Sequence, residues 1–222
     1  MCERYRLTVP AWQLAESFQA WDEIECHPNF NVAPTENVVT VRAVGGKRKI
    51  SNMRWEFIPR WASRNTRGHF NARSEKVMTT PSFSDAMISH RCLIPASAFY
   101  EWQQMGSVKQ PFCFELIGRD VFAFAGLWDQ WNGRDGCVIM TTVPNAALES
   151  IGHDRMPVII DPENYDTWLS SPVNEALALL NAYDATRMRM HPVNRRLNDA
   201  RNKDLEAATR VELNVPVQAS LF

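Results

Sequence analysis

The sequence lacks the patterns that mark membrane, secreted and metal-binding proteins. No apolar run approaches the roughly 20 residues that span a bilayer, and no apolar stretch follows the charged start MCERYR. The five cysteines include no C-x-x-C pair, which argues against a disulfide framework and a zinc ribbon. The five histidines show no H-x-x-x-H spacing. We therefore expect a cytoplasmic protein with free thiols, no membrane contact, no metal and no other cofactor.

A positive excess over the whole chain is also absent, because 24 Lys and Arg stand against 25 Asp and Glu. The distribution is nevertheless uneven. Between Arg42 and Arg73, nine basic residues face one acidic residue, Glu56. A second basic stretch runs from Arg187 to Lys203. This pattern predicts one positive face, which is either a site for a polyanion or an ordinary solvated surface.

No repeat, low-complexity linker or break in composition divides the 222 residues, so we expect one domain. Short apolar runs separated by hairpin-length turns favour antiparallel strands. These runs cover residues 37–44, 91–102, 111–117, 121–131 and 136–144. Helices are expected at 11–21, at 82–90 with Ser82 or Ser84 as N-cap, at 162–169 and at 173–183. The predicted fold is an α+β domain around a mostly antiparallel, barrel-like sheet with flanking short helices.

Cys2 is the first candidate for chemistry, since removal of Met1 would give one residue both a free amine and a thiol. The reference pKa is about 7.7 to 8.0 for an α-amine and about 8.5 for a thiol, so both nucleophiles are partly available near neutrality. Toward an aldehyde, the amine forms a Schiff base, and the thiolate then adds to the imine and closes a thiazolidine ring. A cysteine without a chemical role is the alternative.

Polar residues inside apolar segments supply further candidates. Glu101 lies between aromatic residues in SAFYEWQQ. Desolvation there would raise its pKa and suit it to acid–base catalysis, whereas an ion pair at a sheet edge is the alternative. His153, in SIGHDRMPVII, would be a proton shuttle if it lay beside Glu101 and Cys2, and a structural histidine otherwise.

The segment FNARSEK adds a polar cluster. The alternation of an extended segment would place Asn71, Arg73 and Glu75 on one face. There, Arg73 would hold a phosphate bidentately, and Asn71 would bond a sugar or backbone oxygen. A structural salt bridge explains the same residues equally well.

The motifs and their order closely resemble the SOS-response-associated peptidase family. The matching segments are MCERYR, NFNVAPT, MRWEFIPRWA, FNARSE, RCLIPASAFYEW, KQPFCFEL, FAFAGLWDQW, TTVPNAAL, GHDRMPVII and HPVNRRLNDARN. They span residues 2–203 of a single domain over 1–222, with a C-terminal tail at 204–222. The resemblance implies a protein that shields abasic sites in single-stranded DNA by a covalent crosslink, with self-processing peptidase activity and weak lyase activity. Capture of a single strand needs no symmetry, so we expect a monomer.

The resemblance also implies a role for each matching residue. Cys2 matches the nucleophile that condenses with the aldehyde of the abasic sugar. Glu101 matches the glutamate that helps to open the sugar ring, moves protons and assists removal of Met1. His153 matches the histidine that assists this chemistry and its reversal, and Asn71 matches the residue that holds the N-terminus. The implied DNA contacts are Arg4, Arg73, Arg155, Asn31, Pro34 and Trp61.

Two residues depart from the family pattern. Glu3 and Glu56 stand where the family usually has glycine. Glu3 would weaken phosphate binding if it points into the DNA channel.

Two other functions remain open: a cysteine peptidase that acts on other proteins, and a non-catalytic binder of single-stranded DNA. The second of these predicts that Cys2→Ala leaves all DNA interactions intact.

Overall fold

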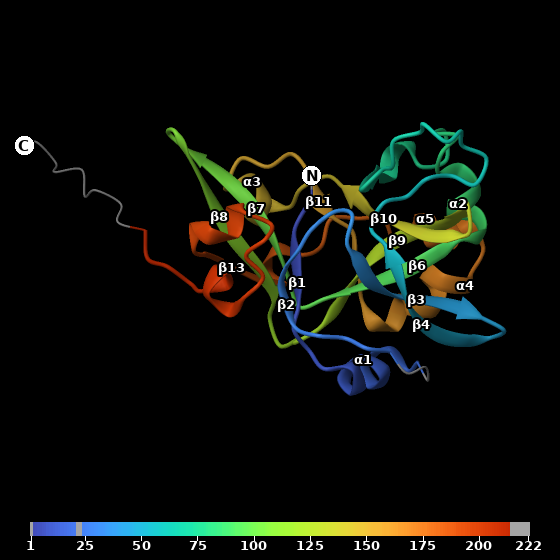
Figure 1. The fold of residues 1–222 in the computed structure, drawn as a ribbon, viewed down its shortest axis with the longest axis horizontal. Helices are drawn as coiled ribbons and strands as arrows, with labels where there is room; N and C mark the ends of the chain where they lie inside the picture. Colours follow the sequence, from blue (N-terminus) through green and yellow to red (C-terminus); the bar gives the residue numbers. More distant parts are fainter. Residues whose placement is uncertain (1, 21–23, 214–222) are drawn as a thin grey trace, which may run out of the picture.

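Two β-sheets organise the fold in the computed structural model, which describes residues 2–20 and 24–213 (Figure 1). The first sheet is antiparallel throughout and occupies the left and centre of Figure 1. Its strands, in spatial order, are β13 (Met188–Pro192), β8 (Val108–Leu116), β7 (Ala98–Met105), β1 (Tyr5–Leu7) and β2 (Asn29–Val32).

The second sheet closes on itself, because β9 pairs with both β6 and β10. The ring consists of β10 (Arg134–Thr142), β4 (Lys47–Arg54), β3 (Asn37–Val44), β6 (Arg91–Ala96) and β9 (Phe122–Trp131). Only the β10–β4 pair of this ring is parallel, so the ring is a mixed barrel. Three short strands extend it: β5 (Asn71–Arg73), β11 (Met156–Pro157) and β12 (Ile159–Ile160). The predicted α+β fold with a mostly antiparallel, barrel-like sheet is therefore confirmed.

The apolar run 91–102 is divided between the two sheets. β6 ends at Ala96 and β7 begins at Ala98, and all ten residues of 91–100 are buried. Ser97 makes the break, because its amide donates to the Arg6 carbonyl at 2.7 Å and its hydroxyl accepts from the Thr8 amide at 3.2 Å. These contacts direct the chain from the barrel into the first sheet, so the expectation of one continuous strand is wrong.

The helices are short and lie at the edges of the sheets (Figure 1). They are α1 (Ala11–Phe18), α2 (Ser84–Ser89), α3 (Ala146–Glu149), α4 (Tyr165–Ser170) and α5 (Val173–Leu177). The expected helix at 11–21 is shorter, because Gln19 takes a left-handed conformation with φ of 49° after α1; residues 21–23 lie outside the described residues. α5 is also shorter than the predicted 173–183, and the Asn181 side chain donates to the Ala178 carbonyl just beyond its end.

Neither Ser82 nor Ser84 caps α2. The N-cap residue is Phe83, which offers no side-chain acceptor, and Ser84 is the first residue of the helix. Phe83 is buried against Phe57, so packing rather than capping sets where this helix begins. The expected helix at 162–169 is present as the 3₁₀ turn η2 (Pro162–Asn164) followed by α4.

One large core fills the barrel and the space between the sheets. A smaller cluster packs on the other face of β7, where Ala98 and Tyr100 contact Ala207 and Ala208 of the 3₁₀ turn η5 (Leu205–Ala208). The beginning of the expected 204–222 tail is thus packed against the domain. Among residues 2–20 and 24–213, no helix is both long and apolar enough to cross a membrane.

Candidate active site

Strand β7 places Glu101 toward the main core. Alternation along the strand puts Ala98 and Tyr100 on the side of the small cluster, and Phe99 and Glu101 on the opposite side. Cys2 belongs to the same main core as Phe99. The chain after Cys2 runs beside β7, where the Tyr100 amide donates to the Arg4 carbonyl at 3.0 Å. The sheet pairing therefore brings the start of the chain to Glu101.

Cys2 is buried, with 0% of its surface exposed. Burial raises the pKa of its thiol well above the ordinary value, and the nearby charge of Glu101 raises it further. The thiol is therefore neutral at physiological pH and needs a base before it can attack. Met1 precedes Cys2 in the sequence, so the Cys2 nitrogen is an amide in this chain.

Glu101 and His153 form a coupled pair. The Glu101 carboxyl is 2% exposed, and burial raises its pKa to about 8. Burial also lowers the pKa of His153, whose Nδ1 lies 3.4 Å from Glu101 Oε2. His153 Nε2 lies 2.9 Å from the Trp102 carbonyl, which only accepts, so Nε2 carries the proton of a neutral ring.

The spacing of this pair falls in the range of an ion pair, but burial of both groups favours the neutral forms near pH 7. In that state the lone pair of His153 Nδ1 faces a protonated carboxyl. One proton can then pass between Glu101 and His153, and Glu101 is poised to act as an acid first and a base afterwards.

An open cleft of about 490 Å³ lies over this pair. Its lining residues come from the start of the chain, the β7–β8 hairpin, the segment between α3 and β11, and residue 198: Glu3, Arg4, Glu101, Trp102, Gln104, Lys109, His153 and Asn198. The Arg4 guanidinium lies over the Trp102 ring, 5.7 Å from its centroid, and the Trp102 indole donates to Asn198 at 2.7 Å. The cleft thus combines cations, an aromatic face and the acid–base pair. It also includes the negatively charged Glu3.

Sequence reasoning missed Trp102, Gln104, Lys109 and Asn198 as cleft residues. Trp102 follows Glu101 directly, and that proximity was the signal available for it. Lys109 and Asn198 are 89 residues apart and meet through a hydrogen bond from the Asn198 amide to the Lys109 carbonyl. Only the packing of the 3₁₀ turn η4 (Arg195–Asn198) on the hairpin shows their proximity.

Asn31 and Pro34 differ in exposure. Asn31 is fully buried, and its side-chain Nδ2 lies within hydrogen-bond distance of the carbonyls of Leu197, Asp199 and Asn202 while its Oδ1 accepts from Arg4 at 3.2 Å. It holds Arg4 in place through these bonds. Pro34, two residues beyond β2, is partly exposed.

The segment that carries Asn71 departs from the expected geometry. β5 ends at Arg73, and Glu75 lies in the 3₁₀ turn η1 (Ser74–Lys76), so Glu75 does not continue the alternation of the strand. Arg73 is exposed, whereas Asn71 Oδ1 is buried and has no hydrogen-bond partner among the described residues. Arg155, expected to contact DNA, is buried against the carboxylate of Glu75.

Trp61 is 61% exposed and lies in the segment between β4 and β5. The residues around it are anchored to β9: Arg60 contacts Asp129 through its backbone amide at 2.8 Å and its Nε at 3.0 Å. The Trp131 indole donates to the Ala62 carbonyl at 3.0 Å. The backbone on both sides of the exposed Trp61 is therefore anchored to β9.

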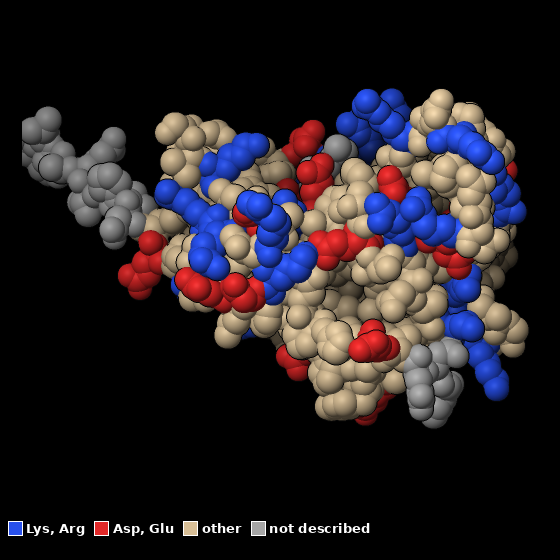
Figure 2. Space-filling model, viewed as in Figure 1, with Lys and Arg blue, Asp and Glu red and all other residues tan. Residues whose placement is uncertain are grey.

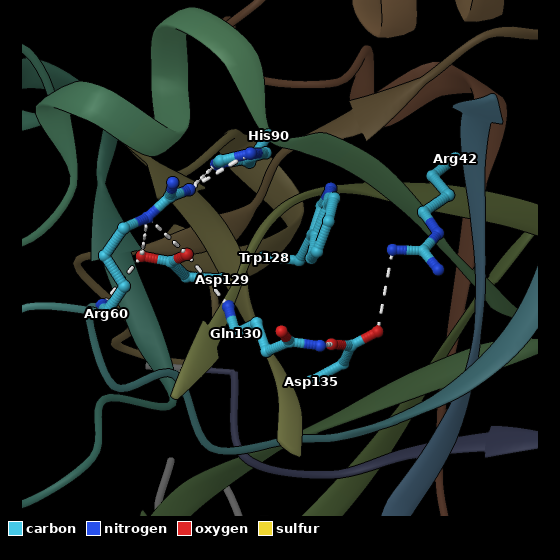
Figure 3. Close-up of a pocket in the computed structure, with 7 residues that line it drawn as sticks. All are labelled: Arg42, Arg60, His90, Trp128, Asp129, Gln130 and Asp135. Atoms are coloured by element: carbon cyan, nitrogen blue, oxygen red, sulfur yellow. Dashed lines mark hydrogen bonds and ion pairs between the residues drawn. The ribbon is translucent and has the colours of Figure 1, made fainter. Parts of the chain in front are cut away.

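A second hollow lies beside the Arg60–Asp129 contact, and Figure 3 shows the residues that line it. The Arg60 guanidinium reaches Asp129 and His90, and Trp128 stands between His90 and Arg42 (Figure 3). Arg42 is in turn paired with Asp135 at 3.5 Å. Arg42 and Arg60 thus both form ion pairs with acids that line the same hollow. The hollow contains neither Glu101 nor His153.

Only part of the predicted positive face is free of internal ion pairs. Within the Arg42 to Arg73 stretch, four arginines pair with acids from elsewhere or nearby: Arg42 with Asp135, Arg48 with Asp166, Arg54 with Glu56 and Arg60 with Asp129. The other five have no ion pair among the described residues: Lys47, Lys49, Arg64, Arg67 and Arg73. Figure 2 shows basic atoms gathered at the upper right and again at the left of the molecule, with acidic atoms among them.

Within the described part of the chain, no three His, Cys, Asp or Glu side chains are grouped to hold a metal ion.

A sequence profile described as SOS response associated peptidase (SRAP) matches residues 1–200. The abasic site processing protein YoqW of Bacillus subtilis (strain 168) is 38% identical over 220 residues, covering 93% of this chain and 98% of that protein. The abasic site processing protein HMCES of Gallus gallus is 28% identical, covering 85% of this chain and 68% of that protein.

A crystal structure of a protein from Bacteroides thetaiotaomicron has the same fold. Its TM-score is 0.84 at 22% sequence identity, and the match covers 95% of this chain and 100% of the other. The similarity extends across both sheets.

Proposed function

Because the chain belongs to the SOS response associated peptidase family, we propose that it processes abasic sites in single-stranded DNA by covalent attachment through Cys2. The observation that supports this most is the meeting of a buried N-terminal-region thiol with a carboxyl group whose pKa is about 8. An aldehyde substrate needs an amine, a thiol and a proton donor. Cys2 and Glu101 would supply all three once Met1 is removed.

The first step is hydrolysis of the peptide bond between Met1 and Cys2, which consumes one water and frees the α-amine. We propose that Glu101 assists this step, since a carboxyl near its pKa both gives and accepts a proton at neutral pH. His153 shares that proton through its 3.4 Å approach to Glu101.

The second step is condensation with the sugar. Glu101 protonates the ring oxygen of the abasic deoxyribose while the anomeric hydroxyl loses its proton to water, so that the ring opens to the aldehyde. The Cys2 amine adds to the carbonyl carbon, and loss of one water gives an imine. The Cys2 thiol then adds to the imine carbon and its proton passes to the nitrogen, which closes the thiazolidine. From the imine, β-elimination of the 3′ phosphate would give weak lyase activity.

The surrounding residues would bind the strand. Asn71 would hold the freed amine through its buried Oδ1, and Arg4 and Arg73 would bind phosphates beside the abasic sugar. Trp61 would stack on or wedge against a neighbouring base. Asn31 and Pro34 would shape the wall, with Asn31 holding Arg4. Arg155 would contribute to the same site.

The test is intact-protein mass spectrometry after incubation with a single-stranded oligonucleotide that carries one abasic site. Wild type should lose Met1 and gain the mass of the oligonucleotide less one water, and Cys2→Ala should give no adduct. An oligonucleotide with a tetrahydrofuran abasic analogue, which has no aldehyde, is the matched control. Wild-type protein that has lost Met1 but forms no adduct would contradict the proposal and favour a peptidase or a simple DNA binder.

A further inference from the structure

Glu75 and Arg155 form a bidentate ion pair near the candidate site. Arg155 Nη1 lies 2.6 Å from Glu75 Oε1, and Nη2 lies 3.0 Å from Oε2. Arg155 Nη2 also donates to the Thr141 carbonyl at 2.6 Å. Arg155 is only 9% exposed, so this bidentate contact is shielded from solvent on the arginine side.

The pair joins two segments that carry proposed site residues. Glu75 lies two residues after Arg73 and four after Asn71, and Arg155 lies two residues after His153. Each segment is attached to the same point of β10, since Thr141 pairs with Arg73 of β5 and with Pro157 of β11. The Glu75–Arg155 contact therefore connects the segment that carries Asn71 and Arg73 with the segment that carries His153, beside Thr141.

The charges of Glu75 and Arg155 neutralise each other within the protein. The hydrogen bond from Arg155 lowers the pKa of Glu75, so its carboxylate is ionised at neutral pH. Both terminal nitrogens of Arg155 face Glu75, which neutralises much of the positive charge that a phosphate would meet. Arg73 differs, because it is exposed and has no ion pair among the described residues.

From these contacts we infer that Glu75 is a positioning residue: through Arg155 it sets the placement of His153 relative to Asn71 and Arg73. This inference rests on the proposed function for its catalytic readout. Loss of the Glu75 carboxylate should slow crosslinking without weakening DNA binding, because it changes the placement of the proton-transfer group and removes no DNA contact. Misplacement of reacting groups by about 1 Å costs on the order of 100-fold in rate.

The experiment compares wild type, Glu75→Gln, Arg155→Glu and the exchanged pair Glu75→Arg with Arg155→Glu. Asp161→Asn is the matched control, since Asp161 also forms a bidentate pair, with Arg187 at 2.8 and 2.9 Å, away from the cleft. Two quantities are measured: the single-turnover crosslinking rate at saturating abasic oligonucleotide, and the affinity for an undamaged oligonucleotide. Glu75→Gln should lower the rate by roughly 10- to 100-fold and leave the affinity unchanged, while Asp161→Asn should change neither.

The exchanged pair separates a positioning role from a phosphate contact. If the link positions His153, exchange should restore at least part of the rate lost in Arg155→Glu alone. A rate in Glu75→Gln equal to wild type would overturn the inference, and so would tighter DNA binding in that variant without a loss of rate.

A second readout does not depend on crosslinking. The ring signals of His153, assigned by their loss in His153→Gln, should shift in the NMR spectrum of Glu75→Gln and stay in place in Asp161→Asn. If wild type forms no adduct but these signals shift, the proposed function fails and the positioning role stands. Unmoved signals in Glu75→Gln count against the positioning role whatever the crosslinking result.

Discussion

Burial gives Glu101 both its chemical usefulness and an energetic cost. A carboxyl with an ordinary pKa would be ionised at pH 7, but desolvation raises the pKa of Glu101 to about 8. Between about pH 4.5 and 8, the folded protein therefore keeps a proton on Glu101 that the unfolded chain has already released. By linkage, the free energy of unfolding should fall as pH rises through this range and level off above it.

This linkage predicts a difference between wild type and Glu101→Gln. The stability of wild type relative to the variant should decline with rising pH by up to about 1.4 kcal/mol per pH unit, and the difference should become constant above pH 8. Urea unfolding at pH 5, 6, 7, 8 and 9 measures it. Parallel profiles for the two proteins would mean that Glu101 titrates normally in the folded state.

Glu3 adds a negative charge to a cleft that also contains Arg4 and Lys109. A carboxylate there opposes the approach of a phosphate, so Glu3→Gln should bind single-stranded DNA about threefold more tightly at low salt, as expected for one like charge some 7 Å away in water. The gain should shrink as salt is added. Fluorescence anisotropy with an undamaged oligonucleotide measures both effects.

The control for this prediction is Glu175→Gln, an equally conservative change at an exposed position of α5 outside the cleft. It should leave the affinity unchanged. Equal affinities for Glu3→Gln and wild type at low salt would show that Glu3 does not meet the phosphates.

At the scale of elements, the connection between β4 and β5 contains Glu56, whose side chain and backbone both lie against glycines. Glu56 pairs with Arg54 at 2.7 Å and Arg134 at 3.4 Å. Its side chain passes over Gly68, where an added Cβ would lie 2.2 Å from Glu56 Cγ. Gly136 faces the Glu56 carbonyl instead, and a Cβ there would lie 2.3 Å from that oxygen. The two glycines thus make room for different parts of one residue.

The two clashes should respond differently to Glu56→Ala, which removes Cγ but keeps the backbone. Gly68→Ala should destabilise the protein by about 1–3 kcal/mol, and most of this cost should vanish when Glu56→Ala is added. Gly136→Ala should cost at least as much and should not be rescued. Chemical denaturation of the single and double variants provides the two cycles, and similar rescue in both would refute this account of the connection.

The elements that the sequence predicted well are those whose patterns are local. The apolar run at 37–44 is bounded by turns, and it matches β3. The division of 91–102 at Ser97 was not predictable, because it depends on hydrogen bonds to Arg6 and Thr8, about 90 residues away. The start of α2 likewise depends on the packing of Phe83 rather than on a capping side chain.

The candidate site shows the same limit. The aromatic surroundings of Glu101 correctly indicated burial and a raised pKa. The bond between Glu75 and Arg155 was not visible, because alternation placed Glu75 with Asn71 on a strand that in fact ends at Arg73. Charge counting also overstated the positive face, since ion pairs with Asp129, Asp135 and Asp166 form only in the folded chain.

At the scale of the whole molecule, the cations of the Arg42 to Arg73 stretch that have no ion pair among the described residues fall, apart from Arg73, into two groups. Lys47 and Lys49 lie on β4 in the β3–β4 hairpin, which extends to the right in Figure 1, away from β7 and β11. Arg64 and Arg67 lie in the segment that carries Trp61 and leads into β5. If the strand passes from the Glu101 cleft toward Trp61, the second group meets phosphates and the first does not.

Salt dependence distinguishes the two groups. Each phosphate contact on single-stranded DNA contributes about 0.7 to the slope of log affinity against log salt concentration. The double variant Arg64→Gln with Arg67→Gln should therefore flatten the slope by up to about 1.4, while Lys47→Gln with Lys49→Gln, which removes the same charge, should leave it unchanged. Anisotropy titrations of an undamaged oligonucleotide over a range of salt concentrations give both slopes. Flattening only in the lysine variant would place the DNA path across the hairpin, and the exposed Trp61 would then lie off that path.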